Sequence, residues 1–305
     1  MKRLIIVYSP NSARFEEVDR KVIQKSRKLP GWMILKYEVK EAPLQEDAGE
    51  LAKIIRKDDL VIAAGGDGTA AMVTNAILLS GKKATLAVMP FGNFNDFAET
   101  LGKMSFERVI KKFEEGRYIE YYPLDIKIDN EHYVYASVYF TVGMMAEAAR
   151  IMKRPKVRKK LIRAKNRMAF SARKMFFWYV KNKRRKDFLP FGMKINGRDV
   201  IKNVTDYIAM NGKTMAGVVP ADGWLDKPGK FWSGTMRNRS FWRMFGKFVK
   251  AIEGELPGKE TEEDILEFPK KTDVFVHAEG EGGMIKNVKK IEVSKNGMSL
   301  RVISS

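Results

Sequence analysis

The chain has 305 residues, 45% of them hydrophobic, and carries a formal net charge of +20. This length and hydrophobic content suit a folded protein with a sizeable core and room for two domains. Because the sequence lacks cysteine, disulfide bonds and thiolate chemistry are excluded. The first apolar run, residues 4–8, is too short for a signal peptide, and no window reaches the roughly 18 apolar residues of a membrane span.

The first part of the chain alternates short apolar segments with helical patterns. Strands are expected at residues 4–8, 32–37, 60–64 and 84–88, and helices at residues 14–28, 47–57 and 69–79. Strands separated by helices predict a parallel sheet with short connections. We therefore expect an α/β domain over residues 1–124.

Period-two segments dominate from residue 125 onward. They lie at residues 125–128, 133–141, 192–195, 207–210, 274–277, 291–293 and 300–303, with turn signals between several of them. Helical insertions are expected at residues 155–182 and 240–253. These features predict a second, β-sandwich-like domain over residues 125–294, while residues 295–305 could return to the first domain.

The pentapeptide Gly65-Gly66-Asp67-Gly68-Thr69 directly follows the third expected strand. Glycines allow backbone N–H groups to approach an anion closely, and Thr69 can cap a helix whose N-terminus favours that anion. Asp67 can hold a metal ion. The pattern is neither a Walker A loop nor a dinucleotide fingerprint. It indicates a phosphate-binding corner, and a strand–turn–helix corner without a ligand is the alternative.

A second polar corner, residues 90–98, follows the fourth expected strand. Gly92 permits close backbone approach. Asn93 and Asn95 supply amides, and Asp96 supplies a carboxylate. Because the carboxyl ends of parallel strands share one edge of a sheet, the two corners should meet there. The polar residues of the second corner could also serve only as a helix cap.

Two later loops carry carboxylates. Glu279-Gly280-Glu281 follows the strand expected at residues 274–277. One of these glutamates could act as a general base if the loop folds back on the first domain, because partial burial raises the pKa of a carboxyl group. Asp222-Gly223-Trp224 could bind a cation. Both loops could instead be solvated turns.

The ordered set of motifs resembles the diacylglycerol kinase catalytic family, the lipid kinases that include bacterial diacylglycerol kinases and sphingosine kinases. The family pattern runs through Asn-Pro-x-Ser-Gly, Gly-Gly-Asp-Gly-Thr, Pro-x-Gly-Thr-x-Asn-Asp-Phe-Ala and a late Asp-Gly-Glu. The counterparts are residues 9–13, 65–69, 90–98 and 279–281. The resemblance covers almost the entire chain. NAD kinases and phosphofructokinases share the glycine corner, so the ordered set is more specific than any one motif.

The resemblance implies an ATP-dependent kinase of a membrane-lipid hydroxyl, with diacylglycerol as the first candidate, and ATP between the two domains. The first domain would then be the nucleotide-binding domain. The implied nucleotide contacts are Ser9, Asn11, Ser12, Gly65, Gly66, Asp67, Gly68, Thr69, Gly92, Asn93 and Asn95.

The resemblance also implies roles for the acidic residues. Asp67, Asp96 and Asp125 would organise the catalytic Mg²⁺, partly through water, and Glu281 would be the general base. A second, structural Mg²⁺ would bind Asp222 and the backbone carbonyls of Val219 and Trp224.

Several positions depart from the family pattern. Ser9 replaces Asn, Ala13 replaces Gly, Ala71 and Met72 replace Asn and Glu, Asn93 replaces Thr, Phe94 replaces a small residue and Glu279 replaces Asp. Three alternatives therefore stay open. The protein could be a catalytically degenerate family member that binds lipid or nucleotide, an NAD kinase-like enzyme, or a basic nucleic-acid-binding protein, although no known nucleic-acid module is visible.

The positive charge is concentrated in residues 150–186, which contain 17 Lys and Arg and no Asp or Glu. An apolar stripe typical of one helix face runs through this segment, and residues 239–250 again combine basic and aromatic side chains. Such helices can lie on an anionic membrane, where each cation contributes about 1 kcal/mol, or the stripe can pack on the protein. We expect a cytoplasmic, peripherally membrane-associated lipid kinase. The sequence determines neither the lipid nor the oligomeric state.

Overall fold

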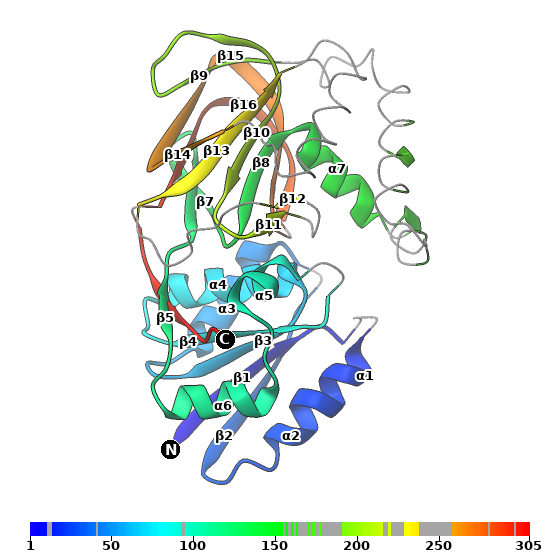
Figure 1. Ribbon diagram of the computed structural model, residues 1–305, viewed down its shortest axis with the longest axis vertical. Coiled ribbons are helices and arrows are strands. Elements are labelled where there is room, and N and C mark those ends of the chain that lie inside the picture. The colour runs from blue at the N-terminus through cyan, green and yellow to red at the C-terminus, as the bar shows by residue number, and fades with distance from the viewer. Residues whose placement is uncertain are drawn as a thin grey trace.

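The computed structural model describes residues 1–10, 14–40, 42–92, 95–154, 191–215, 219–220, 229–237, 258–279, 281–295 and 297–305, with single positions between 156 and 177. These residues form two domains, one above the other in Figure 1. The first contains a six-stranded, mostly parallel sheet, and the second contains a nine-stranded sheet. The predicted combination of an α/β domain with a mostly-strand domain is confirmed. The helical insertions predicted at residues 155–182 and 240–253 lie almost entirely outside the described residues.

The sheet of the first domain has the strand order β2-β1-β3-β4-β17-β5. Its strands are β1 (Lys2–Tyr8), β2 (Trp32–Glu38), β3 (Leu60–Gly65), β4 (Thr85–Pro90), β5 (Ile119–Tyr121) and β17 (Leu300–Val302). The last strand, β17, pairs parallel with β4 and antiparallel with β5. The sequence allowed residues 295–305 to return to the first domain, and β17 lies in the sheet of that domain.

Helices cover both faces of this sheet (Figure 1). One face carries α1 (Phe15–Val18), the π-helix η1 (Asp19–Ile23), α2 (Gln24–Ser26) and α6 (Phe106–Glu114). The other face carries α3 (Leu44–Ile54), α4 (Asp67–Ser80) and α5 (Asp96–Leu101) and is turned toward the second domain. Alternate residues of β1 serve the two cores, with Leu4 and Ile6 on the first face and Ile5 and Val7 on the second.

Helix α4 lies between the sheet and the second domain and is buried on nearly all sides. Nine of its 14 residues are buried, including Ala71 and Met72. A helix that is apolar all round needs packing partners on every side, which the two domains together supply. Asn75 of α4 donates through Nδ2 to the Tyr135 carbonyl oxygen at 2.9 Å and accepts from the Tyr135 N–H at 2.9 Å. This pair of hydrogen bonds ties α4 to the second domain.

The second domain is built around the long hairpin of β15 and β16. Its sheet consists of β6 (Leu124–Ile128), β7 (Glu131–Ala136), β8 (Tyr139–Gly143), β9 (Phe191–Ile195), β10 (Ile201–Met210), β13 (Phe231–Arg237), β14 (Lys259–Thr261), β15 (Glu263–Ala278) and β16 (Glu281–Ser294). A separate pair comprises β11 (Thr214–Met215) and β12 (Val219–Pro220).

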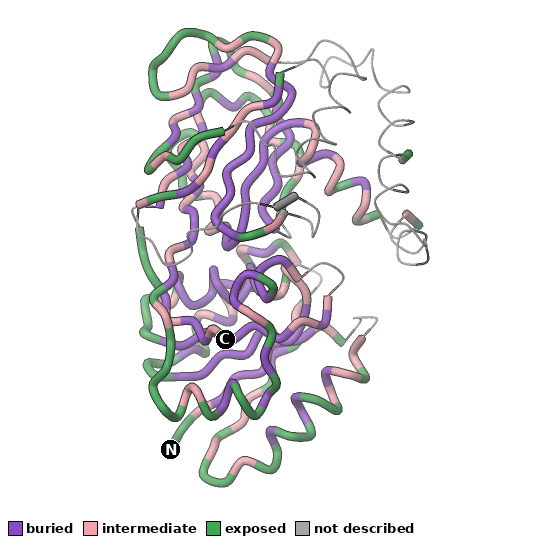
Figure 2. Tube along the Cα trace, in the orientation of Figure 1, coloured by how far each residue is buried: buried purple, intermediate pink, exposed green. Residues whose placement is uncertain are grey.

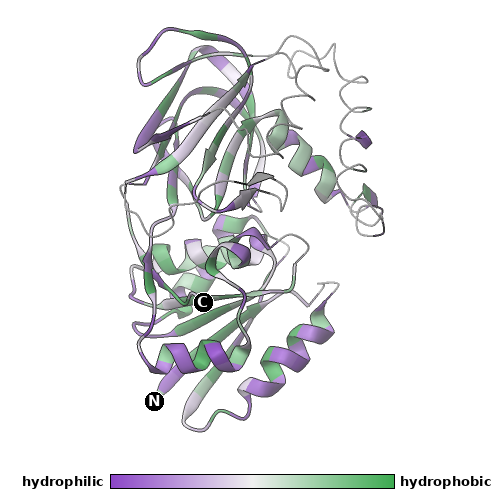
Figure 3. Ribbon diagram, in the orientation of Figure 1, coloured by the Kyte–Doolittle hydropathy of each residue, from purple (hydrophilic) through white to green (hydrophobic). Residues whose placement is uncertain are grey.

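The burial pattern follows this architecture. The central strands of the second domain are buried along most of their length in Figure 2. Figure 3 shows hydrophobic residues on the strands of the first domain, whereas α6 combines hydrophilic and hydrophobic residues. Among the described residues, no helix is long and apolar enough to cross a membrane.

Helix α7 (Met144–Lys153) begins where the sequence pattern predicted the end of a strand. Gly143 makes this change of direction with φ +112°, and Asp206 on the neighbouring strand β10 accepts a hydrogen bond from the Met145 N–H at 2.6 Å. The capping carboxylate is therefore supplied by another strand, which a local reading of the sequence does not reveal. Burial raises the pKa of Asp206 to about 7.

We expect Gly143→Ala to destabilise the protein by about 2 kcal/mol or more. A Cβ at this position would lie 2.1 Å from the Thr205 carbonyl oxygen and would require an unfavourable positive φ. Gly49→Ala in α3 is the matched control, because no atom lies within 4 Å of its added Cβ. It should be neutral or stabilising by up to about 1 kcal/mol. Urea unfolding followed by circular dichroism measures both changes, and equal stabilities would contradict the prediction.

Candidate functional site

Two glycine-containing corners meet at the carboxyl edge of the first sheet. Gly65 ends β3 opposite Pro90 at the end of β4, and its carbonyl oxygen accepts a hydrogen bond from the Phe91 N–H at 2.8 Å. A Cβ added to Gly92 would lie 2.3 Å from the Gly66 Cα. Only a backbone without side chains at this contact allows the two loops to come so close.

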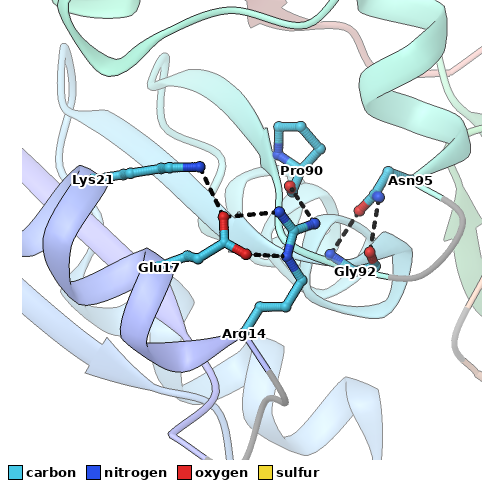
Figure 4. A network of polar contacts seen from close by, with 6 residues as sticks. All are labelled: Arg14, Glu17, Lys21, Pro90, Gly92 and Asn95. Carbon is cyan, nitrogen blue, oxygen red and sulfur yellow. Dashed lines mark hydrogen bonds and ion pairs between the residues drawn. The ribbon is translucent and has the colours of Figure 1, made fainter. Parts of the chain in front are cut away.

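Asn95 shapes the second corner from within. Its Oδ1 accepts from the Gly92 N–H at 2.8 Å, and its Nδ2 donates to the Gly92 carbonyl oxygen at 3.0 Å, as drawn in Figure 4. Asn95 also adopts φ +57° immediately before α5, but its side chain makes no capping bond to that helix. The predicted nucleotide-contacting residues Asn93 and the bulky Phe94 lie outside the described residues.

A charged network lies against the same corner (Figure 4). The Arg14 guanidinium donates to both carboxylate oxygens of Glu17 at 2.8 and 2.9 Å and to the Pro90 carbonyl oxygen at 3.5 Å. Lys21 Nζ donates to Glu17 at 2.7 Å. Hydrogen bonds from Arg14 and then Lys21 lower the pKa of Glu17 to about 2. The sequence analysis missed Arg14, and its position directly after the motif at residues 9–13 was the available signal.

The remaining predicted nucleotide contacts are only partly described. Ser9 follows the end of β1, Gly68 is exposed in the first turn of α4, and Thr69 is half-buried there. Asn11 and Ser12 lie outside the described residues. The roles of all these residues toward a nucleotide stay predictions.

Asp67 and Asp96 are the first residues of α4 and α5. Asp67 Oδ1 accepts from the Phe97 N–H at 3.2 Å, and the buried Asp96 accepts through Oδ1 from the Thr214 hydroxyl of the second domain at 2.7 Å. Burial, and then the charge of Asp96, raise the pKa of Asp67 to about 7 against the opposing effect of backbone hydrogen bonds. The two carboxylates therefore share one desolvated region.

Glu279, at the turn between β15 and β16, brings a third carboxylate to this region. It is 3% exposed and accepts backbone hydrogen bonds from Ser137 at 2.9 Å, from Tyr139 at 2.7 Å and from Val138. Burial raises the pKa of Glu279 well above its usual value, and the charge of Asp67 acts in the same direction. The residues alone left both Glu279 and Glu281 as possible bases, and the resemblance gave Glu279 no role of its own, although its place in the late motif was a signal.

Asp67, Asp96 and Glu279 together form an acidic cluster, and Tyr139 lies beside it. Its ring stacks on His277 with the centroids 5.8 Å apart. Burial raises the pKa of the Tyr139 hydroxyl well above its usual value, and the charges of Asp96, Asp67 and Glu279 raise it further. Acidic groups from both domains therefore act on one buried phenol.

The other two predicted acidic residues have partners of their own. Glu281 Oε2 accepts from the Leu44 N–H at the first turn of α3 at 3.1 Å, so the late loop folds back on the first domain. Asp125 Oδ1 lies 2.9 Å from His132 Nδ1. Neither contact involves Asp67, and the roles predicted for Glu281 and Asp125 stay predictions.

The residues present fit a magnesium ion held jointly with a substrate. Within the described part of the chain, no group of three or more His, Cys, Asp or Glu side chains is arranged to hold a metal ion. Mg²⁺ is commonly bound by one or two carboxylates together with substrate phosphates and water, which suits Asp67 and Asp96. Of the residues predicted for the second Mg²⁺, Val219 lies in β12, and Asp222 and Trp224 lie outside the described residues.

Sequence comparison finds relatives of the first domain. Residues 3–121 match the family model of the diacylglycerol kinase catalytic domain. The chain is 40% identical over 108 residues to a diacylglycerol kinase of Bacillus subtilis (strain 168), and 32% identical over 103 residues to one of Staphylococcus carnosus (strain TM300). These matches span 33% of this chain and 34% and 33% of the two relatives. The resemblance to this family is confirmed on the sequence of that region.

Solved structures extend the likeness over the whole chain. A diacylglycerol kinase from Bacillus anthracis str. Sterne has a TM-score of 0.62 at 17% identity, covering 100% of this chain and 97% of that one. An NAD kinase from Archaeoglobus fulgidus in complex with ATP has a TM-score of 0.52 at 12% identity, with coverages of 99% and 93%. At these identities the likeness shows a shared fold alone.

The raised pKa of Asp67 predicts a pH-dependent loss of stability without ligands. The folded protein holds the proton up to about pH 7, whereas the unfolded chain releases it near pH 4, so stability falls as the pH rises between these values. Asp67→Asn cannot ionise and should gain roughly 2 to 4 kcal/mol over the wild type between pH 4 and pH 8.

Urea unfolding in EDTA at pH 4, 6 and 8 tests this expectation. Asp199→Asn, at an exposed position, is the matched control and should follow the wild type at every pH. A constant difference between Asp67→Asn and the wild type would show that the Asp67 carboxyl group is not perturbed.

Proposed function

We propose that this protein is an ATP-dependent kinase that phosphorylates a hydroxyl group of a membrane lipid, with diacylglycerol as the first candidate acceptor. The observation that carries the proposal is the meeting of Asp67 and Asp96 of the first domain with Glu279 of the second, beside the paired glycine corners. Phosphoryl transfer depends on positioning and charge neutralisation more than on covalent catalysis. The two matched relatives are diacylglycerol kinases, which supports the same class of activity.

The glycine corner would receive the triphosphate of ATP. Backbone N–H groups at Gly65 to Thr69 can face phosphate oxygens, and the first turn of α4 adds its favourable dipole. Asp67 and Asp96 would hold Mg²⁺, which when bound neutralises charge on the phosphates. Asn95 would keep the second corner in shape through its two bonds to Gly92.

The two glutamates of the late loop would have different tasks. Glu279 is buried and accepts three backbone N–H groups, so we assign it to fixing the turn between β15 and β16. Glu281 is half-buried and accepts a hydrogen bond from the Leu44 N–H, so an acceptor hydroxyl can still reach its carboxylate. As the lipid oxygen bonds to the γ-phosphorus and the bond to the leaving ADP oxygen breaks, Glu281 would take the hydroxyl proton.

Glu281→Gln should lower kcat for lipid phosphorylation by at least about 100-fold, because an amide cannot accept that proton. Its melting temperature should change little, since the amide oxygen can still accept from the Leu44 N–H. Glu279→Gln should instead lower the melting temperature, because it directs an N–H₂ group toward backbone N–H groups. The assay uses labelled ATP, Mg²⁺ and diacylglycerol in anionic vesicles.

Glu131→Gln, at an exposed position of β7, is the matched control and should retain full activity. Full turnover by Glu281→Gln would show that Glu281 is not the general base. ATP binding without transfer to any lipid in a panel would identify a catalytically degenerate protein. Transfer to NAD in the absence of vesicles would identify an NAD kinase-like enzyme.

We further propose that residues 150–186 and 239–250 dock the protein peripherally on an anionic membrane. The support is the charge of the sequence, since these segments lie mostly outside the described residues. An enzyme whose acceptor stays in a bilayer has to bind that surface, and clustered cations strengthen such binding. A cytoplasmic location follows only if the docking surface is the cytoplasmic leaflet.

Replacing Lys183, Arg184, Arg185 and Lys186 together with Gln should weaken binding to phosphatidylglycerol vesicles by more than about tenfold at low salt. Replacing Arg20, Arg27, Lys28 and Lys36 with Gln removes the same charge from the exposed surface of the first domain and should have little effect. Vesicle sedimentation measures both affinities. Equal losses would show that only the net charge matters, and binding to nucleic acid instead of vesicles would overturn the docking proposal.

A further inference from the structure

A cationic cavity lies at the edge of the first sheet opposite the glycine corners. It has a volume of about 450 Å³ and is lined by residues at the start of β1 and in the turn before β3, with Phe113 of α6 as its aromatic wall. The strand β3 begins beside this cavity and ends at Gly65. At about 3.3 Å per residue, its six residues separate the cavity from the acidic cluster by roughly 20 Å.

Arg3 is the unusual member of this cavity. Its side chain is 10% exposed and its Nη2 donates to the Ile54 carbonyl oxygen at 3.2 Å. Its Nε and Nη1 are buried, and they have no hydrogen-bond partner within the described part of the chain. Leaving a buried charged donor unsatisfied costs at least about 1 to 3 kcal/mol, so an acceptor that reached it would be bound favourably.

Asp59 forms a long ion pair with this guanidinium but leaves its Nη1 without a hydrogen-bond partner among the described residues. Its Oδ1 lies 3.6 Å from Arg3 Nε, beyond hydrogen-bond distance, while its Oδ2 accepts from the Arg56 N–H at 2.8 Å. Burial raises the pKa of Asp59 even though Arg3 and Arg56 act in the opposite direction. The carboxylate therefore serves both the turn before β3 and the ion pair with Arg3, and the guanidinium keeps donors that make no hydrogen bond in the described part of the chain.

The charges around the cavity favour an anion. Four cationic side chains, Lys2, Arg3, Arg56 and Lys57, stand against the two carboxylates of Asp58 and Asp59. Lys2 is paired with Glu114 at 2.7 Å, and Asp58 lies 3.6 Å from Arg301. Arg56 and Lys57 are exposed at the rim, and no hydrogen bond or ion pair of their side chains is recorded in the described structure.

We infer that this cavity is a binding site for a phosphate group, either free phosphate or the monoester of a small molecule. The planar guanidinium of Arg3 would donate from Nε and Nη1 to phosphate oxygens, and Arg56 and Lys57 would close over the anion from the rim. A cavity of about 450 Å³ also has room for a small organic group beside Phe113. The site is separate from the proposed triphosphate site and does not depend on the proposed function.

The test is a titration of the full chain with inorganic phosphate at constant ionic strength, followed by ¹⁵N amide shifts and by the melting temperature. Saturable shifts should appear at residues 2–4 and 56–60, with an increase in melting temperature. Arg3→Met should abolish both effects, and Arg20→Met, an equal change at an exposed position, should retain them. Because Arg3→Met could fail to fold, the rim variant Arg56→Met/Lys57→Met provides a second test and should weaken phosphate binding by about tenfold or more.

Shifts confined to the glycine corner, or a phosphate response that persists in both Arg3→Met and the rim variant, would overturn the inference. A parallel titration with phenyl phosphate distinguishes the two sources of the anion. Tighter binding of phenyl phosphate assigns the site to monoesters, and equal or tighter binding of inorganic phosphate assigns it to the free anion. Loss of kinase activity in Glu281→Gln bears on the proposed function alone, so the two proposals fail independently.

Discussion

The contact between Gly66 and Gly92 is the constraint on which the rest of the site depends. These backbones belong to loops that follow neighbouring parallel strands, and a single added Cβ at Gly92 would collide with the Gly66 Cα. Their close approach places the first turns of α4 and α5 side by side, and therefore brings Asp67 and Asp96 into one region. Asn95 holds the second loop from within, and Arg14, directly before α1, donates to the Pro90 carbonyl oxygen at its start.

The second domain completes the region around Asp67 and Asp96 by contributing a hydrogen-bond donor and a further acidic group. Thr214 donates a hydrogen bond to Asp96, while Glu279 adds a third carboxyl group that accepts three backbone N–H groups. Burial makes the mutual repulsion of these carboxylates costly, because a low-dielectric environment screens it weakly. A site of this kind is less stable empty than when it holds cationic ligands, which is consistent with a role in binding metal and phosphate.

The two edges of the first sheet have opposite electrostatic character. Its carboxyl edge gathers the acidic cluster, whereas its amino edge carries the cavity around Arg3. The same strand, β3, reaches both edges, so its buried apolar residues form the shared core between two polar ends. Continuous packing through α4 then connects this core to the second domain, with Asn75 as the polar link.

The sequence by itself determined the alternation of strands and helices, the two glycine corners and the late acidic loop, because each depends on residues that are neighbours in the chain. It missed α6 and α7, and the N-terminus of α7 is capped by Asp206 from a distant strand. Only the tertiary structure decided that Glu279 lies near Asp67 while Glu281 contacts α3, since these two side chains of one turn have different partners. It also decided that β17 lies between β4 and β5 and that Arg3 is buried beside Asp59. Long-range packing sets these features, because a local sequence pattern does not determine which distant groups will surround a residue.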